Sequence, residues 1–259
     1  MKITSLLENT TERKDTRVEH GLSLYIETES RVILFDMGQT DMFYENATAL
    51  GIDLSKVDIA ILSHGHYDHG GGLRKFLELN SRAPVYIHKD AFLPHYNGTE
   101  KYIGLDTALK DHPQIIFTDG ECRITESLTL FTCNEKEKIY PTVPSGLTEM
   151  EGGVLVPDSF RHEQYLLIEE NGKRVLISGC SHKGATDIAE WFRPDVFIGG
   201  FHYSKVTPGE ALANAAKTLA TYPTTFYTCH CTGSEQYAFM RRFMPSLHYL
   251  SCGQTITIN

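Results

Sequence analysis

The sequence predicts an α/β fold in which two mixed β-sheets pack face to face with helices on their outer sides, a four-layer αββα sandwich. Two observations lead to this prediction. Apolar stretches typical of buried strands alternate with amphipathic helical stretches, and they do so in two halves of similar order. Loops that contain histidine follow strand ends in both halves, and strand ends on one rim of such a sandwich converge on one cleft.

The length of 259 residues exceeds the usual size of one domain, but sandwiches of this length commonly form a single domain around one core. We therefore expect one domain over residues 1–259. With 41% hydrophobic and 22% charged residues, the composition is that of an ordinary globular protein.

The first half of the chain is expected to contain several strands and one short helix. Beginning with a strand from Ile3, the apolar stretches predict further strands near residues 22–27, 32–36, 57–62 and 85–88. Residues 73–79 have the apolar spacing of a short amphipathic helix. Residues 89 to about 120 predict an irregular segment, of the kind that often covers a site.

The second half repeats this order of elements. Its apolar stretches predict strands near residues 122–124, 128–132, 165–169, 174–178, 196–199 and 226–230. Amphipathic spacing predicts helices from about 185 to 192 and from about 208 to 221.

The loop over residues 63–72, Ser-His-Gly-His-Tyr-Asp-His-Gly-Gly-Gly, predicts a metal site. It lies between a predicted strand and a predicted helix, where open α/β sheets place their ligands. In an extended segment His64 and His66 point to the same side, so both can reach one ion. Asp68 and His69, just past the turn, can reach a second ion beside it. The alternative is a polar surface turn, which so dense a set of ligand-type side chains disfavours.

The other metal ligands are expected from distant histidines at strand ends. His182 follows the predicted strand over 174–178 and precedes a helix, so its place mirrors that of the loop. His230 ends another apolar strand. We predict that His182 serves the ion of the first two loop histidines and that His230 lies nearer the second ion. His162, just before a strand, is the rival for the role of His182. Five further histidines have no motif around them and are expected on the surface or hydrogen-bonded in the core: His20, His88, His95, His112 and His248.

The pattern His-x-His-x-Asp-His over residues 64–69, after a hydrophobic strand, resembles the signature of the metallo-β-lactamase superfamily. Three further stretches resemble its strands. Residues 31–38 are similar to an early strand that ends in Asp and Gly, residues 174–179 to a later strand that ends at the metals, and residues 225–230 to a late strand that delivers a histidine. The resemblance implies the fold of that superfamily with one or two divalent metal ions. Imidazole and carboxylate ligands suit zinc, with iron and manganese as alternatives.

Three shorter segments resemble one branch of the superfamily: Glu163–Leu166, Gly179–Gly184 and His230–Gly233. This branch includes the archaeal synthase that joins a dihydropterin to β-ribofuranosylaminobenzene phosphate, and many bacterial chains share the pattern. The resemblance implies the branch and leaves the reaction open.

Cys180 departs from the family pattern, because many members carry there an Asp that bridges both metals. A thiolate can bind zinc or iron, and a buried structural thiol is the alternative. Whether one or two ions bind therefore stays open. The six cysteines are widely spread and do not predict a disulfide framework, which fits thiols in a reducing cytosol.

Three residues are expected to act on the substrate. A pair of metal ions supplies a water of lowered pKa and a Lewis acid, and Asp68 is the predicted catalytic residue that orients this water. His202 is assigned to substrate binding at the leaving group, with a packed residue after a buried strand as the alternative. Lys183 is assigned to a phosphate or carboxylate of the substrate, with an exposed lysine as the alternative.

The composition excludes several partners. The formal net charge of −9, without a basic cluster, argues against nucleic acid. No apolar run approaches the ~20 residues that span a bilayer, and the N-terminal residues lack a secretory apolar region. We expect a cytoplasmic protein with a small-molecule substrate and no membrane partner.

The expected function is that of a metal-dependent hydrolase acting on a small phosphorylated or ester-type substrate. One alternative is a metal-dependent transferase that condenses a pterin diphosphate with an arylamine ribose phosphate. The other is a non-catalytic metal-binding module, since the scaffold carries many chemistries.

Overall fold

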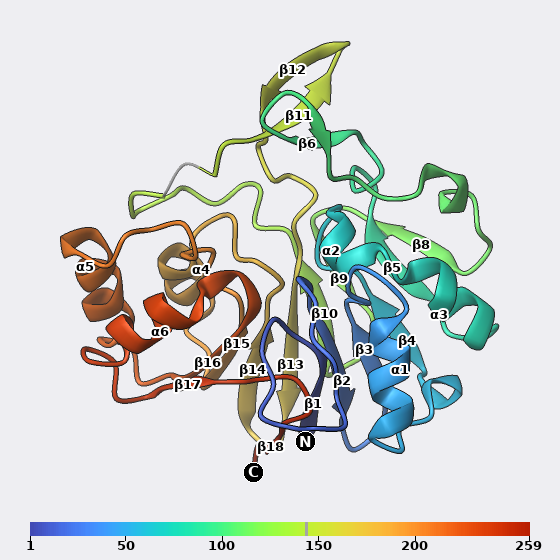
Figure 1. Ribbon diagram of the computed structural model, residues 1–259, viewed down its shortest axis with the longest axis horizontal. Helices are drawn as coiled ribbons and strands as arrows, with labels where there is room; N and C mark the ends of the chain where they lie inside the picture. Colours follow the sequence, from blue (N-terminus) through green and yellow to red (C-terminus); the bar gives the residue numbers. More distant parts are fainter. Residues whose placement is uncertain (143–144) are drawn as a thin grey trace. The chain divides into compact units, whose positions relative to one another are not determined.

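A computed structural model describes residues 1–142 and 145–259 of the chain (Figure 1). The described chain divides into two compact units, each built around its own seven-stranded sheet. Unit one comprises residues 1–119, 146–164 and 251–259, and unit two comprises residues 120–145 and 165–250. The expectation of one domain over residues 1–259 stays a prediction.

The large sheet of unit one has the strand order β18-β1-β2-β3-β4-β5-β8. Its strands are β1 (Lys2–Leu7), β2 (Ser23–Glu27), β3 (Val32–Phe35), β4 (Ile59–Ile61), β5 (Val85–His88), β8 (Ile115–Thr118) and β18 (Thr255–Thr257). Neighbours from β18 to β3 pair antiparallel, whereas β3, β4, β5 and β8 pair parallel. Because parallel strands end at the same edge of a sheet, the segments that follow β3, β4 and β5 meet there.

Two helices of unit one pack against this sheet, α1 (Met42–Ala49) and α3 (Leu73–Leu79). The buried residues of α3 are Leu73, Phe76 and Leu77, which have the i, i+3, i+4 spacing of one helix face. They share one apolar core with buried side chains of α1, β3 and β5. This core anchors the helix that follows the histidine-rich loop.

Unit one also contains a small antiparallel sheet in the order β12-β11-β6-β7. Its strands are β6 (His95–Asn97), β7 (Lys101–Tyr102), β11 (Leu147–Glu151) and β12 (Val154–Pro157). The prediction of an irregular segment over 89–120 is therefore wrong where β6, β7 and β8 lie. These strands are only two to four residues long, and β6 pairs with β11 from a remote part of the chain. Such strands leave too short a pattern to detect from periodicity.

The sheet of unit two has the order β17-β16-β15-β14-β13-β10-β9. Its strands are β9 (Glu121–Arg123), β10 (Leu128–Phe131), β13 (Tyr165–Glu170), β14 (Lys173–Ile177), β15 (Val196–Gly199), β16 (Thr225–Thr228) and β17 (Leu247–Tyr249). The strands from β14 to β17 are parallel, so their carboxyl ends lie at one edge. The helices are α4 (Ala185–Phe192), α5 (Glu210–Leu219) and α6 (Ser234–Met240).

The predicted α/β class with mixed sheets flanked by helices is confirmed. The predicted bounds of α3, α4, β5 and β15 agree with the observed ones, whereas β4 is shorter than the predicted strand over 57–62. The helices α1 and α6 were not expected, and neither was the hairpin of β11 and β12. Among the described residues, no helix combines the length and the apolar character needed to cross a membrane.

Candidate metal centre

The histidine-rich loop of unit one follows β4 and leads into the short helix α2 (Tyr67–Gly70), so that Asp68 and His69 lie on its first turn. The ring of His64 lies 4.5 Å from that of His66 and 4.2 Å from that of His69, measured between centroids. All three histidines are buried, and Asp68 is 8% exposed. The loop therefore gathers three imidazoles in a space shielded from water.

Asp36, the residue after β3, holds this loop from the neighbouring strand. Its carboxylate accepts hydrogen bonds of 2.7 Å from the backbone N–H and the hydroxyl of Ser63. Its Oδ2 atom also accepts a 2.7 Å hydrogen bond from Nδ1 of His69. A carboxylate only accepts, so His69 carries its proton on Nδ1, and Nε2 keeps the lone pair that a metal needs.

The hydroxyl of Ser63 sets the tautomer of His64 in the same way. It gives its one hydrogen to Asp36, so its contact of 2.8 Å with Nδ1 of His64 is one in which the imidazole donates. The proton of His64 therefore lies on Nδ1, and Nε2 keeps its lone pair. In both histidines Nδ1 donates a hydrogen bond to another residue of the protein, an arrangement typical of metal-binding imidazoles.

Asp68 lies beside His69, with its Oδ2 atom 3.8 Å from Nε2 of that ring. Two ligands of one ion bound at about 2.0–2.2 Å in tetrahedral geometry lie roughly 3.4 Å apart. This spacing is consistent with the prediction that Asp68 and His69 share an ion. The half-exposed His20 adds a contact, with its Nε2 atom 3.1 Å from Oδ2 of Asp68.

The charges of unit one favour a cation at the loop. Burial opposes protonation of His69, but the carboxylates of Asp36 and Asp68 outweigh it and raise the pKa of this imidazole. A field that stabilises a proton here also stabilises a metal ion. The donor set and its charge therefore fit a divalent cation of the kind that imidazole and carboxylate bind.

In unit two, three predicted site histidines follow neighbouring parallel strands. His182 follows β14, His202 follows β15 and His230 follows β16. The rings of His182 and His202 are 4.3 Å apart between centroids. The expectation that His230 ends its strand is wrong, because β16 ends at Thr228 and His230 opens the 3-10 helix η3 (His230–Thr232). Its left-handed φ of 47° turns the chain out of the sheet there.

The thiols of Cys180 and Cys231 and a ring nitrogen of His230 lie within 4.8 Å of one another. All three residues are buried and belong to unit two. Two sulfurs and one nitrogen form a set that soft or borderline ions such as zinc accept. The predicted metal-binding roles of His182 and His230, and the alternative roles of Cys180 as a ligand or a structural thiol, stay predictions.

Lys183 is buried, so the alternative of an exposed lysine is wrong. Its ammonium group donates a 3.0 Å hydrogen bond to the carbonyl oxygen of Thr132 and lies 5.7 Å from the centre of the Tyr165 ring. The predicted contacts of Lys183 and His202 with substrate stay predictions.

Sequence reasoning missed four polar residues that unit one brings to the loop: Asp36, His20, His95 and Asp158. Asp36 lies in a stretch that resembled a family strand, which was a usable signal. The contacts of His20 and Asp158 join residues far apart in the chain, and no local pattern marks them. His162, the predicted rival ligand, belongs to the same group as Asp158 and His95, whose ligand-type atoms lie within 4.8 Å of one another and of His66.

The family model of the metallo-β-lactamase superfamily matches residues 16–220. The chain belongs to this superfamily, and the predicted family is confirmed. Two curated relatives come from Methanocaldococcus jannaschii. The uncharacterized protein MJ0448 is 30% identical over 208 residues, which are 76% of this chain and 77% of the relative. The 7,8-dihydropterin-6-methyl-4-(β-D-ribofuranosyl)-aminobenzene-5'-phosphate synthase is 29% identical over 92% of this chain and 90% of its own.

Solved structures confirm the fold of the metallo-β-lactamase type. Tm1679, described as a metal-dependent hydrolase of the β-lactamase superfamily, has a TM-score of 0.83 and 28% sequence identity, covering 100% of this chain and 99% of its own. The metallo-β-lactamase fold protein YhfI from Bacillus subtilis has a TM-score of 0.60 and 14% identity, with 98% of each chain covered. The latter likeness concerns the fold alone.

Proposed function

We propose that this protein is a metal-dependent hydrolase that cleaves a small phosphorylated or ester-type substrate. The observation that carries the proposal is the orientation of the loop imidazoles. His64 and His69 each direct the protonated nitrogen to protein and keep a lone pair on Nε2. Asp68 lies beside the latter nitrogen.

One or two divalent ions, zinc in the first instance, would be held by His64, His66, Asp68 and His69. The predicted ligands His182 and His230 are kept in the proposal. When bound, such ions lower the pKa of water toward neutrality and act as a Lewis acid. The protein contributes fixed, buried ligands, so little reorganisation accompanies the reaction.

Asp68 has the central catalytic role in this proposal. Its carboxylate is the one acidic group of the loop and is slightly exposed, so it can accept a hydrogen bond from water and orient it. The imidazole of His20 contacts the same carboxylate and helps to fix its direction. Lys183 and His202 are proposed to contact the substrate.

A transferase is the second candidate, favoured by the likeness to the synthase over 92% of this chain. In that case the substrate would be a pterin diphosphate and an arylamine would take the place of water. A parallel assay with a phosphodiester, a lactone, and a dihydropterin diphosphate with and without an arylamine distinguishes these reactions.

We expect ester or phosphodiester cleavage that a chelator abolishes and added Zn²⁺ restores. Product formation that requires the arylamine would replace the hydrolase by the transferase. A fully metal-loaded protein that turns over none of the substrates would favour a non-catalytic metal-binding module.

A further inference from the structure

Residues 158–164, here called the clasp, lie against the metal loop within unit one. The backbone N–H of Gln164 donates a 2.8 Å hydrogen bond to the carbonyl oxygen of Ser63. The side-chain amide of Gln164 donates a 2.8 Å hydrogen bond to the carbonyl oxygen of Leu62. The backbone N–H of Gly65 donates in turn to Nδ1 of His162 at 2.9 Å. The clasp therefore fixes the backbone on both sides of His64.

His162 uses both of its ring nitrogens inside this arrangement. Since Nδ1 accepts the hydrogen bond from Gly65, the proton of the neutral ring lies on Nε2. Burial lowers the pKa of His162 to about 3, which keeps the ring neutral. Its Nε2 atom lies 3.3 Å from Oδ1 of Asp158 and donates to that carboxylate. A nitrogen that carries a proton has no lone pair for a metal, so this geometry gives His162 a role other than the rival ligand.

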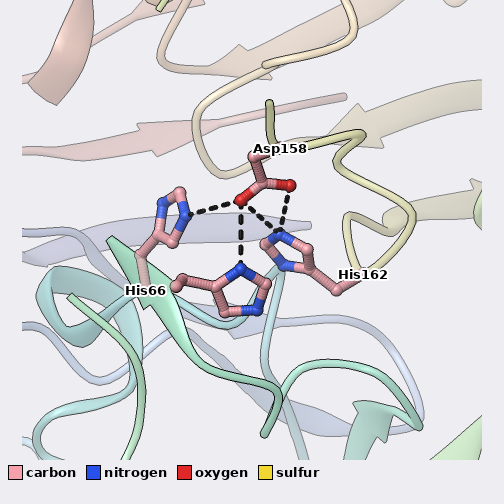
Figure 2. Close-up of side chains that lie close together, drawn as sticks. His66, Asp158 and His162 are labelled. Carbon is pink, nitrogen blue, oxygen red and sulfur yellow. Dashed lines mark hydrogen bonds and ion pairs between the residues drawn. The ribbon is translucent and has the colours of Figure 1, made fainter. Parts of the chain in front are cut away.

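Asp158 is the centre of a buried group of imidazoles (Figure 2). Its Oδ2 atom accepts a 3.0 Å hydrogen bond from Nδ1 of His95, and its Oδ1 atom accepts one of 2.7 Å from the backbone N–H of Phe160. Oδ2 also lies 3.7 Å from Nε2 of His66. Asp158 is thus fixed by three neighbours and presents the same carboxylate to a loop histidine.

The contact with Asp158 favours one tautomer of His66. At 3.7 Å the carboxylate and Nε2 make an electrostatic contact rather than a hydrogen bond, and a carboxylate favours a proton on the nitrogen that faces it. This tautomer leaves the lone pair of His66 on Nδ1. Asp36 contacts His69 through the opposite ring nitrogen, Nδ1, and there the contact is a hydrogen bond of 2.7 Å. Each of these two imidazoles therefore has a buried carboxylate behind it.

Asp158 also supplies a fixed negative charge behind the ring of His66. Burial disfavours its ionised form, but the hydrogen bonds that it accepts from His162, His95 and the backbone N–H of Phe160 stabilise the carboxylate. A carboxylate in this place makes the imidazole a more basic ligand and restricts its rotation.

We propose that Asp158 is the positioning residue of His66. His162 in turn positions both Asp158 and Gly65, and thereby supports the placement of His66 for metal binding. The proposal rests on the metal site of the proposed function. It assigns the clasp to metal affinity rather than to the substrate.

The test measures Zn²⁺ affinity by chelator competition on metal-free full-length protein, together with the visible spectrum of the Co²⁺-loaded protein. We expect Asp158→Asn to weaken metal binding by about 10- to 100-fold and to shift the Co²⁺ bands. The exposed Asp58, which accepts a 2.8 Å hydrogen bond from the N–H of Val32, provides the matched control Asp58→Asn, with wild-type affinity and spectrum expected.

A second pair of variants guards against a failure of Asp158→Asn to fold. The amide oxygen of His162→Asn can still accept the hydrogen bond from Gly65, whereas His162→Phe cannot accept it. We expect a smaller loss of Zn²⁺ affinity in the asparagine variant than in the phenylalanine variant. Equal affinities in both variants and in the wild type would overturn the role of His162.

The variant His66→Ala distinguishes a failure of the positioning role of Asp158 from a failure of the metal site itself. If His66→Ala loses metal and folded Asp158→Asn keeps wild-type affinity and Co²⁺ spectrum, the positioning role is wrong and the metal site stands. If His66→Ala itself keeps the wild-type metal content and affinity, the metal site of the proposed function is wrong, and the positioning role falls with it.

Discussion

Asp36 and His69 are joined by a 2.7 Å hydrogen bond between Oδ2 and Nδ1, although they lie 33 residues apart in the sequence. Asp36 has a left-handed φ of 60°, which is uncommon outside glycine. The turn allows one carboxylate to reach both Ser63 and His69. The residue after β3 thereby holds both Ser63 and His69 of the loop that follows β4.

Replacement of Asp36 is expected to harm both stability and metal binding. Asp36→Ala leaves buried donors of Ser63 and His69 without their acceptor, which should lower the free energy of unfolding by about 3 kcal/mol. Urea unfolding measures this change, and elemental analysis measures the accompanying loss of metal. Asp58→Asn, at an exposed carboxylate, should change stability by less than about 1 kcal/mol. Equal stability of Asp36→Ala and wild type would show that the carboxylate does not hold the loop.

His64→Ala or His66→Ala should remove one metal while leaving the fold largely intact, because the apolar core around the sheet of unit one does not include these side chains. Metal content by elemental analysis and the far-ultraviolet circular dichroism spectrum measure the two effects. His112→Ala, at a half-buried histidine outside the loop, is the control with unchanged metal content. A double variant that retains the wild-type metal content would contradict this prediction.

Asp68→Asn is expected to reduce turnover more than it reduces retention of the ion bound by His64 and His66. The amide keeps the size of the side chain but cannot act as a general base, so kcat on an identified substrate should fall by about 100-fold or more. Kinetics and metal analysis on the same preparation measure both quantities. Full rate at normal metal content would exclude the proposed catalytic role.

Gly65→Ala should disturb the loop by steric conflict. A Cβ atom at this position would lie 2.2 Å from the carbonyl oxygen of Ala91, which is backbone and cannot move aside cheaply. We expect a loss of about 1–3 kcal/mol in stability together with weaker Zn²⁺ binding. Gly209→Ala, whose added Cβ would meet only a carbonyl oxygen at 3.7 Å, should change neither. Wild-type behaviour of Gly65→Ala would mean that the backbone there is looser than its contacts imply.

Cys252 should make the protein less stable in alkali. Burial raises the pKa of this thiol from 9.0 to about 11, and its sulfur donates a 3.3 Å hydrogen bond to the carbonyl oxygen of Leu6. Above about pH 9 the unfolded thiol loses its proton while the folded one keeps it, so stability falls as pH rises toward 11. Urea unfolding at pH 8, 9, 10 and 11 should show a shallower decline for Cys252→Ser. Parallel curves for the two proteins would contradict the assignment.

Much of unit one's loop could be predicted because its information is local. The spacing of His64 and His66 in the segment after β4, with His69 on the next helical turn, indicates which side chains approach one another without any distant contact. The same holds for α3, whose apolar spacing lies within seven residues. Family resemblance added the strand β3, which Asp36 follows directly.

The clasp could not be predicted in this way. The contact of Gly65 with His162 spans 97 residues, and that of His95 with Asp158 spans 63. No periodic sequence pattern links the two residues of either pair. The strands in the intervening sequence are short, and β6 pairs with β11 from a remote part of the chain. The local sequence around His95 contains no motif and gives no hint of its partner Asp158.

Each loop imidazole is contacted by another side chain of the protein: His64 by Ser63, His69 by Asp36 and His66 by Asp158. These contacts are made by the folded chain and do not depend on a metal ion. In small zinc domains the metal drives folding, so removing the metal unfolds the protein. Here the fold of unit one holds the loop imidazoles, so we expect the chain to stay folded when one ion is exchanged for another of similar preference. The ion found after purification would then reflect the supply of metals during growth as much as the donor atoms themselves.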